Sequence, residues 1–216
     1  AKLKKYQELI EFQISKQNMS VLNMLNTKYF IVADKKTKQP TAQRNPGALG
    51  NAWFVQQIKF VANADKEMAA LNDFNPSYMA IVDVRYKNQI QDFKPELDAN
   101  ATIKLTDYKP NYLVYESKTS SEQFAVFSEI YYDKGWNVYI DEAPAEYIRS
   151  NYLLRAMKIP EGNHKIEFKF EPKSYFIGEK IALISSLVLF LAVVAGLLFE
   201  IRKYLKSEEA SVSNFK

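Results

Sequence analysis

Residues 164–171 read HKIEFKFE, and the alternation within them decides the fold of the chain. Ile166, Phe168 and Phe170 are separated by charged residues, the period of two that is typical of a strand with one buried and one solvated face. Six more segments with strand character precede this one, about ten residues apart. They cover residues 101–106, 112–118, 123–132, 137–141, 145–148 and 152–159.

Short runs of turn-forming residues separate these predicted strands. The runs are residues 109–111 (KPN), 133–135 (DKG), 142–144 (EAP) and 160–163 (PEGN). Pro, Gly, Asn and Asp favour turns because they fix or free the backbone dihedrals, or bond nearby backbone groups. Seven short strands joined in this way predict an antiparallel, jelly-roll-like β-sandwich.

The N-terminal part has a different pattern. Residues 1–26 place apolar side chains three and four positions apart, which predicts an amphipathic helix that can break near Asn18. Residues 63–74 predict a short helix capped by Asn63 or Asp65. Residues 39–50 (QPTAQRNPGALG) are dense in Pro, Gly and Asn, which predicts a loop. With the sandwich, these segments make the fold class α+β.

An uncharged apolar stretch follows the last strand. Residues 181–199 (IALISSLVLFLAVVAGLLF) are 19 residues long, close to the ~20 needed to cross ~30 Å of hydrocarbon. The alternative is a buried core helix, but such a helix normally has a polar stripe, and this stretch has none. Three basic residues follow it within two turns and two precede it, which favours a cytoplasmic C-terminus. They are Arg202, Lys203 and Lys206 after it, and Lys173 and Lys180 before it.

These patterns divide the chain into four predicted parts. Residues 1–77 form a helical and mixed α/β segment, 78–174 the β-sandwich, 175–201 a transmembrane helix and 202–216 a cytoplasmic tail. Residues 1–180 would then lie outside the cytoplasm. The chain begins at Ala1, and its first thirty residues do not have the pattern of a signal peptide. We therefore expect the C-terminal piece of a longer protein of the bacterial cytoplasmic membrane, with membrane lipid and its own upstream membrane domain as partners.

Composition excludes several kinds of chemistry. The chain has no Cys and one His, which rules out disulfide frameworks, thiolate metal sites and clustered imidazole ligands. Its net charge of +4 on a mixed surface argues against nucleic-acid binding. Asp133, Asp141 and Glu142 are the best catalytic carboxylates, but all three lie in predicted turns, where such residues are common. We expect no catalytic residue, metal or cofactor in this chain.

Aromatic residues gather within residues 131–152 and indicate a binding face. Exposed rings beside carboxylates and amides suit sugars, which offer C–H faces for stacking and hydroxyls for hydrogen bonds. The alternative is that these rings pack the sandwich. The predicted glycan site consists of Trp136, Tyr132, Asp133, Asp141 and Tyr152.

Several blocks of the sequence resemble a known family. They read LNTKYFIV (25–32), NPGALGNAWFV (45–55), YKPNYLVYE (108–116), SEIYYDKGWNVYIDEAPAEY (128–147) and IPEGNHKIEFKFEPKSYFIG (159–178). In this order, and followed by a membrane helix, they resemble the C-terminal part of YfhO-type bacterial membrane proteins from about residue 22 to residue 205. Residues 141 and 142 are Asp and Glu where the family usually has Asp-Gly, which argues against a tight turn that depends on glycine there.

The resemblance implies a large multi-pass protein of the polyprenyl-phosphate-dependent glycosyltransferase type, with sugar transfer at the outer face of the cytoplasmic membrane. It also implies a catalytic acid in an early outer loop, so no catalytic residue carries over to this chain. We therefore expect an accessory domain that positions a glycan or a lipid-linked acceptor. The alternative is a non-enzymatic module that docks another envelope protein or braces its own membrane helices.

Overall fold

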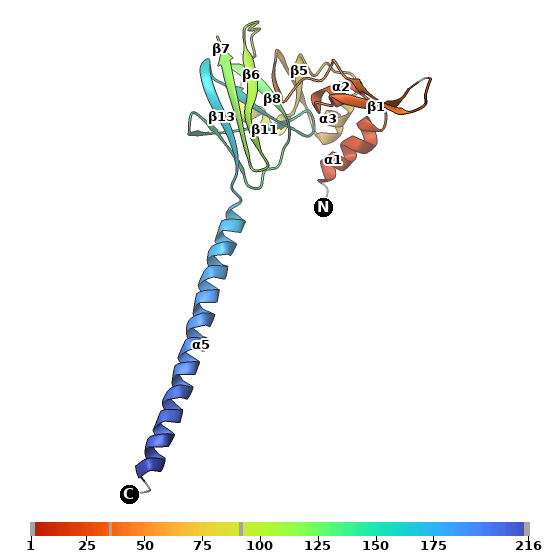
Figure 1. Cartoon of the computed structure of the whole chain (residues 1–216). Coiled ribbons are helices and arrows are strands. Elements are labelled where there is room, and N and C mark those ends of the chain that lie inside the picture. Colours follow the sequence, from red (N-terminus) through yellow and green to blue (C-terminus); the bar gives the residue numbers. More distant parts are fainter. Residues whose placement is uncertain (1–2, 35, 91–92, 214–216) are drawn as a thin grey trace. The chain divides into compact units, whose positions relative to one another are not determined.

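The structure is a computed structural model that describes residues 3–34, 36–90 and 93–213. It contains helices and mostly antiparallel strands, which confirms the predicted α+β class. The chain divides into two compact units, Ala1–Glu171 and Pro172–Lys216. The two units are described separately below (Figure 1).

Two antiparallel sheets form the centre of the first unit (Figure 1). The five-stranded sheet has the order β10 (Ala143–Ala145), β9 (Trp136–Ile140), β13 (Gly162–Phe170), β7 (Tyr112–Thr119) and β6 (Thr102–Lys109). The four-stranded sheet has the order β11 (Ile148–Ser150), β12 (Leu154–Ile159), β8 (Gln123–Ile130) and β3 (Ala52–Val55).

A buried aromatic cluster packs the two sheets against each other, as expected for a sandwich. Tyr115 of β7 and Phe168 of β13 come from one sheet, and Phe127 of β8 from the other. The ring of Phe127 lies 4.9 Å from that of Tyr115 and 5.1 Å from that of Phe168, both edge to face. The period of two seen in the sequence therefore points these side chains into the space between the sheets.

The other face of the four-stranded sheet carries a second core. Phe124 and Val126 of β8 and Leu154 and Ala156 of β12 pack against the N-terminal elements. These elements are α1 (Lys4–Leu9), the π-helix η1 (Ile10–Ile14), α2 (Met19–Met24), α3 (Ala64–Ala70) and the parallel pair of β4 (Gln57–Val61) and β5 (Met79–Asp83). A 3-10 turn, η2 (Val84–Tyr86), and α4 (Lys87–Ile90) follow β5. The first unit thus has three layers.

Two predicted helix features are confirmed. The N-terminal helix breaks before α2, where Asn18 accepts a hydrogen bond from the backbone of Val21 at 3.3 Å. Of the two predicted caps of the second helix, Asn63 is the one that acts, since its side chain accepts from the backbone of Lys66 at 3.0 Å. Each such cap satisfies a backbone N–H at the start of a helix and contributes about 1 kcal/mol.

The predicted loop over residues 39–50 is wrong for its first half. Pro40–Arg44 forms β2, which pairs antiparallel with β1 (Tyr29–Ala33) in a separate two-stranded sheet. Pro40 suggested a loop because proline lacks a backbone N–H. It is nevertheless compatible with a strand here, since it is the first residue of an edge strand.

A tight turn forms at Asp141-Glu142 without the glycine that the family usually has there. Ile140 pairs with Ala143, so these two residues alone connect β9 to β10. Their φ angles are 49° and 69°, the left-handed values that both central residues of a type I′ turn need and that Gly adopts most easily. Side-chain bonds of Asp141, described below, hold this turn in the absence of glycine.

The second unit is the long helix α5 (Lys173–Ser213). Among the described residues it is the one helix long and apolar enough to cross a membrane, over Lys173–Lys203. The predicted span of residues 175–201 lies inside it. The predicted boundaries at residues 77, 174 and 201 stay predictions, and residues 214–216 of the predicted tail lie outside the described residues.

Candidate functional site

The residues predicted to bind a glycan lie in three separate places. Trp136 occupies the first, on the side of β9 that faces the other sheet, where it is half-buried. The guanidinium of Arg155 lies 4.2 Å from the centre of the Trp136 ring. The centre of the Phe170 ring lies 5.4 Å from that of Trp136. Trp136 is therefore part of a stack between the sheets.

Arg155 is an unusual member of this inner layer. Only 2% of it is exposed, and its Nε donates to the carbonyl of Ile130 at 3.1 Å. Its guanidinium also lies 5.1 Å from the ring of Phe168. Burial lowers the pKa of Arg155 because it disfavours the charged form. The two aromatic faces partly replace water around the cation.

Tyr132 and Asp133 lie at the same end of β9 as Trp136. Tyr147 links this end, because its hydroxyl donates to the carbonyl of Tyr132 at 3.0 Å and lies 3.3 Å from that of Trp136. Asp133 is exposed in the turn before β9. The structure thus brings three of the five predicted residues together, but the indole is turned toward the core.

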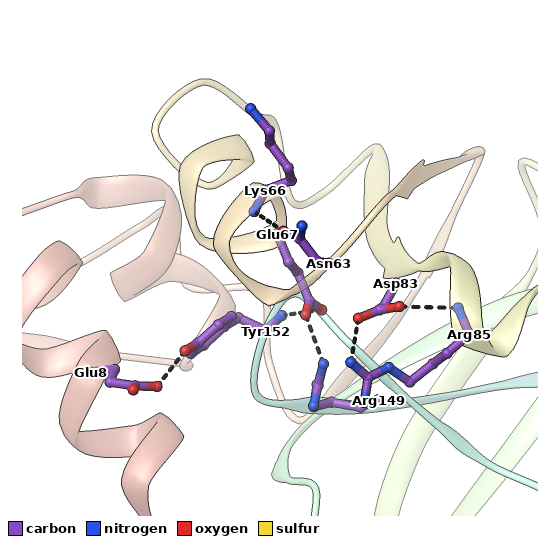
Figure 2. A network of polar contacts seen from close by, with 8 residues as sticks. All are labelled: Glu8, Asn63, Lys66, Glu67, Asp83, Arg85, Arg149 and Tyr152. Carbon is purple, nitrogen blue, oxygen red and sulfur yellow. Dashed lines mark hydrogen bonds and ion pairs between the residues drawn. The ribbon is translucent and has the colours of Figure 1, made fainter.

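Tyr152 lies in a second place, within a buried polar network (Figure 2). It is 5% exposed, and its backbone N–H donates to Glu67 Oε1 at 2.9 Å. Its hydroxyl donates to Glu8, and the ammonium of Lys5 lies 3.8 Å from the centre of its ring. Tyr152 therefore has little surface with which to contact a ligand.

Glu67 is the centre of that network. It is fully buried in α3, and Arg149 Nη2 lies 2.8 Å from its Oε2 (Figure 2). Burial raises the pKa of Glu67, and the Arg149 guanidinium and the Tyr152 N–H oppose the rise. The network joins α1, α3 and the turn between β11 and β12, so its geometry indicates a structural role.

Asp141 occupies the third place, at the opposite end of β9 from Trp136. Its Oδ1 accepts from the backbone of Lys165 at 2.9 Å, and its Oδ2 lies 2.6 Å from His164 Nδ1. The other ring nitrogen of His164 lies 2.9 Å from the carbonyl of Glu161. Both ring nitrogens face acceptors, an arrangement that favours the imidazolium form because that form has two N–H donors. These two bonds raise the pKa of His164, and the bond from His164 lowers that of Asp141.

A shallow groove of about 520 Å³ opens beside the Asp141–His164 pair. Each residue that lines it has a polar or charged side chain, although the carbon atoms of these side chains contribute about half of the surface. The residues come from β6, β7, β13 and the β9–β10 turn. The lining includes Thr102, Lys104, Thr106, Glu116, Lys118 and Asn163. Hydroxyls, an amide, ammonium groups and carboxylates thus converge on one concave surface, a set that can donate to and accept from hydroxyl groups.

Two aromatic residues outside the predicted glycan site, Tyr139 and Tyr112, lie on the same outer face. Tyr139 of β9 stands opposite Glu167 of β13, and Tyr112 of β7 opposite Lys169. The Tyr112 hydroxyl donates to Glu167, and that of Tyr139 donates to Glu171 at 3.2 Å. The signal was present in the parity of β9, since Tyr139 is an odd number of positions from Trp136 and therefore points to the other face.

Glu167 organises this part of the face although it is almost buried, with 3% exposed. Lys165 and Lys169 place their ammonium groups 3.2 Å and 3.6 Å from its Oε1. The bond from Tyr112 is the main cause of its lowered pKa, and the lysine ammoniums add to the effect. The alternating outward residues of β13 therefore form a fixed polar row between the groove and the two tyrosines.

Within residues 3–34, 36–90 and 93–203, no group of three His, Asp or Glu side chains is placed to hold a metal ion.

Comparison with known proteins gives one match. A family model described as "Bacterial membrane protein YfhO" matches residues 30–185, which is more than half of the chain. Searches of the curated proteins and of the solved structures returned no match.

Proposed function

Since the chain belongs to the YfhO family of bacterial membrane proteins, we propose that its first unit is an accessory domain that binds a glycan or a lipid-linked acceptor. It would lie outside the cytoplasm and present that ligand to a catalytic membrane domain encoded upstream. The glycosyltransferase activity of that upstream domain is part of the proposal and rests on the family resemblance.

The observation that carries the proposal is the groove beside Asp141 and His164. A saccharide needs donors and acceptors at fixed positions, because each of its hydroxyl groups can do both. Asp141 is held by His164 and by the backbone of Lys165, so its remaining lone pairs point in fixed directions. Little conformational freedom would be lost there on binding.

The two outer tyrosines extend the same surface. The rings of Tyr139 and Tyr112 have lysine ammoniums near them, with Lys169 at 4.9 Å and 5.8 Å from the two ring centres. A sugar ring could stack on either tyrosine ring once the flexible lysine moves aside. Sugar C–H groups and an ammonium group both favour the electron-rich face of an aromatic ring. The proposed site therefore runs along β13, on the face opposite to Trp136.

The test is a titration of the full chain in lipid nanodiscs with oligosaccharides released from bacterial envelope polymers. We expect saturable binding by calorimetry, weakened about tenfold by Asp141→Asn, since a hydrogen bond to a charged group contributes ~1.5–3 kcal/mol. Asparagine tolerates left-handed backbone angles, so this variant keeps the turn. The matched control is Asp73→Asn, at an exposed residue away from the groove.

A second candidate is a bracing module without a ligand, and the buried Glu67–Arg149 network favours it. That network makes the junction of α1, α3 and the sheet rigid, as a mechanical support requires. The same titration separates the two candidates. Saturable binding that Asp141→Asn weakens and Asp73→Asn preserves supports the first candidate, and the absence of binding for every saccharide tested contradicts it.

A further inference from the structure

The β1–β2 hairpin and its flanks, residues 28–44, form an arm that projects from the rest of the first unit (Figure 1). Its base is anchored by buried Asn45, whose Nδ2 donates to Asn23 Oδ1 at 2.9 Å and to the carbonyl of Thr27 at 2.8 Å. The backbone of Asn45 also donates to the carbonyl of Lys28 at 2.8 Å. The arm therefore leaves the body in a fixed direction.

One face of the arm is apolar and exposed. Cross-strand pairing puts Tyr29, Ile31 and Ala33 on the same face as Ala42 and Pro40, with Arg44 opposite Tyr29 at the base of that face. Tyr29 is 60% exposed and Ile31 is 72% exposed. An isolated two-stranded hairpin is only marginally stable in water, so a face of this kind gains stability when something covers it.

The arm also contains the whole net charge of the protein. Residues 28–44 have five basic residues and one acidic residue, a net charge of +4, which equals the formal charge of the whole chain. The acidic residue, Asp34, accepts hydrogen bonds from the backbone of Lys36 at 2.9 Å and of Thr37 at 2.7 Å, so it serves the turn. None of the ion pairs between described residues involves Lys28, Lys36, Lys38 or Arg44.

We infer that the arm docks on an anionic lipid surface, with its apolar face in the headgroup region and its cations on the lipid phosphates. Exposed apolar and aromatic side chains flanked by Lys and Arg are the chemistry of interfacial segments. The charge of the arm is complementary to anionic lipid, and α5 keeps the chain in a membrane, so a lipid surface is always at high local concentration. That is why lipid is favoured over a protein partner.

The absence of cysteine makes a direct test simple. The full chain with the single substitution Ala42→Cys is labelled with an environment-sensitive fluorophore and placed in nanodiscs of phosphatidylcholine, with or without phosphatidylglycerol. Lipids with a nitroxide on the acyl chain report contact by quenching. We expect quenching at least about threefold greater in the phosphatidylglycerol discs, because each basic residue near such a surface contributes ~1 kcal/mol, or about fivefold in partitioning.

Two variants make the test specific. The triple variant Lys36→Gln, Lys38→Gln and Arg44→Gln should reduce quenching to the level of the neutral discs. The variant Ile31→Ser should reduce it in anionic discs without changing the charge. A matched control removes three positive charges from exposed residues outside the arm and should retain the quenching. Its substitutions are Lys16→Gln, Lys59→Gln and Lys66→Gln.

Three outcomes overturn the inference. One is equal quenching in both kinds of disc. A second is that neither kind of disc gives quenching. The third is a blue shift without quenching that grows with protein concentration, which would mean that a second copy of the chain covers the arm.

Discussion

Glu67 Oε2 and Arg149 Nη2 lie 2.8 Å apart, and both side chains are buried. The pair joins α3 to β11, and through Tyr152 and Glu8 it reaches α1 (Figure 2). A charge removed from water in this way is stable only with its partner, because neither ion can recover its hydration inside the protein.

The first prediction concerns this pair. Arg149→Met should lower the free energy of unfolding by about 3–5 kcal/mol, since it leaves the Glu67 carboxylate buried without its cation. The double variant Glu67→Leu with Arg149→Met should recover most of that loss. Denaturation of the full chain in detergent, followed by tryptophan fluorescence, measures both. A double variant as unstable as the single one would contradict this account.

The second prediction separates packing from binding among the aromatics. Trp136→Ala should lower the free energy of unfolding by about 3 kcal/mol, because the indole fills the space between the sheets beside Arg155. Tyr139→Ala removes a ring from the outer face and should cost less than about 1 kcal/mol. Thermal unfolding of the two variants, compared with wild type, checks the difference. Equal losses would argue that Trp136 is not part of the core.

The third prediction is the pH dependence of the Asp141–His164 pair. The bonds to Asp141 and Glu161 raise the pKa of His164 above 6.5 in the folded protein. The stabilisation that protonated His164 contributes is therefore complete below pH 6.5 and is lost as the pH rises through this raised pKa. The pKa of Asp141 is lowered from 3.8, so its stabilisation is present above pH 3.8 and is lost as the pH falls through the folded-state value. The pair thus stabilises most between these values.

His164→Gln should therefore destabilise the protein by about 0.5–1 kcal/mol near pH 5.5, a modest effect because the carboxylate is half exposed. The difference from wild type should shrink toward pH 9. Urea titrations at a series of pH values measure it. A difference that grows with pH would have the wrong sign for an imidazolium in the folded state.

The fourth prediction concerns the turn between β9 and β10. Glu142→Gly should raise the free energy of unfolding by about 0.5–1 kcal/mol, because glycine adopts a φ of 69° without steric cost. Glu146→Gly serves as the control, since Glu146 is exposed and is not among the residues with positive φ. Glycine gives the unfolded chain more conformational freedom, so Glu146→Gly should leave the free energy of unfolding unchanged or lower it. Thermal unfolding of both variants decides the matter.

The fifth prediction is the topology. The C-terminus should lie in the cytoplasm, because the basic residues after the span outnumber those before it. A reporter fused after Lys216 should therefore be active if it is of a kind that functions in the cytoplasm. Paired fusions of alkaline phosphatase and a fluorescent protein give opposite signals on the two sides of the membrane. Phosphatase activity at this position would reverse the proposed orientation of the first unit.

The sequence allowed good prediction wherever a single local rule decides the structure. Strict alternation located β13, the polar residues around Asn18 located a helix break, and the capping side chain of Asn63 located the start of α3. An uncharged stretch of 19 residues located the span within α5. In each case the physical cause lies within a few residues of the element that it specifies.

Prediction failed where residues outside the segment itself decide. The strand β2 forms because β1 pairs with it, which outweighs the loop signal of Pro40. The turn at Asp141 holds because Lys165 and His164, more than twenty residues away, bond its carboxylate. The aromatic cluster was recognised as a group, but which rings face outward depends on the pairing of β9 with β13, which composition does not specify.

The pairing of β3 with β8 has a consequence for how the chain acquires its structure. Trp53 of β3 lies opposite Val126, so this edge of the four-stranded sheet cannot close until more than seventy further residues have been synthesised. Until then β3 has no partner, because the strand that it pairs with has not yet been made. Pairings this far apart in sequence slow folding and leave strand edges open to other chains. A nascent copy would therefore need protection from aggregation until residues 123–130 emerge.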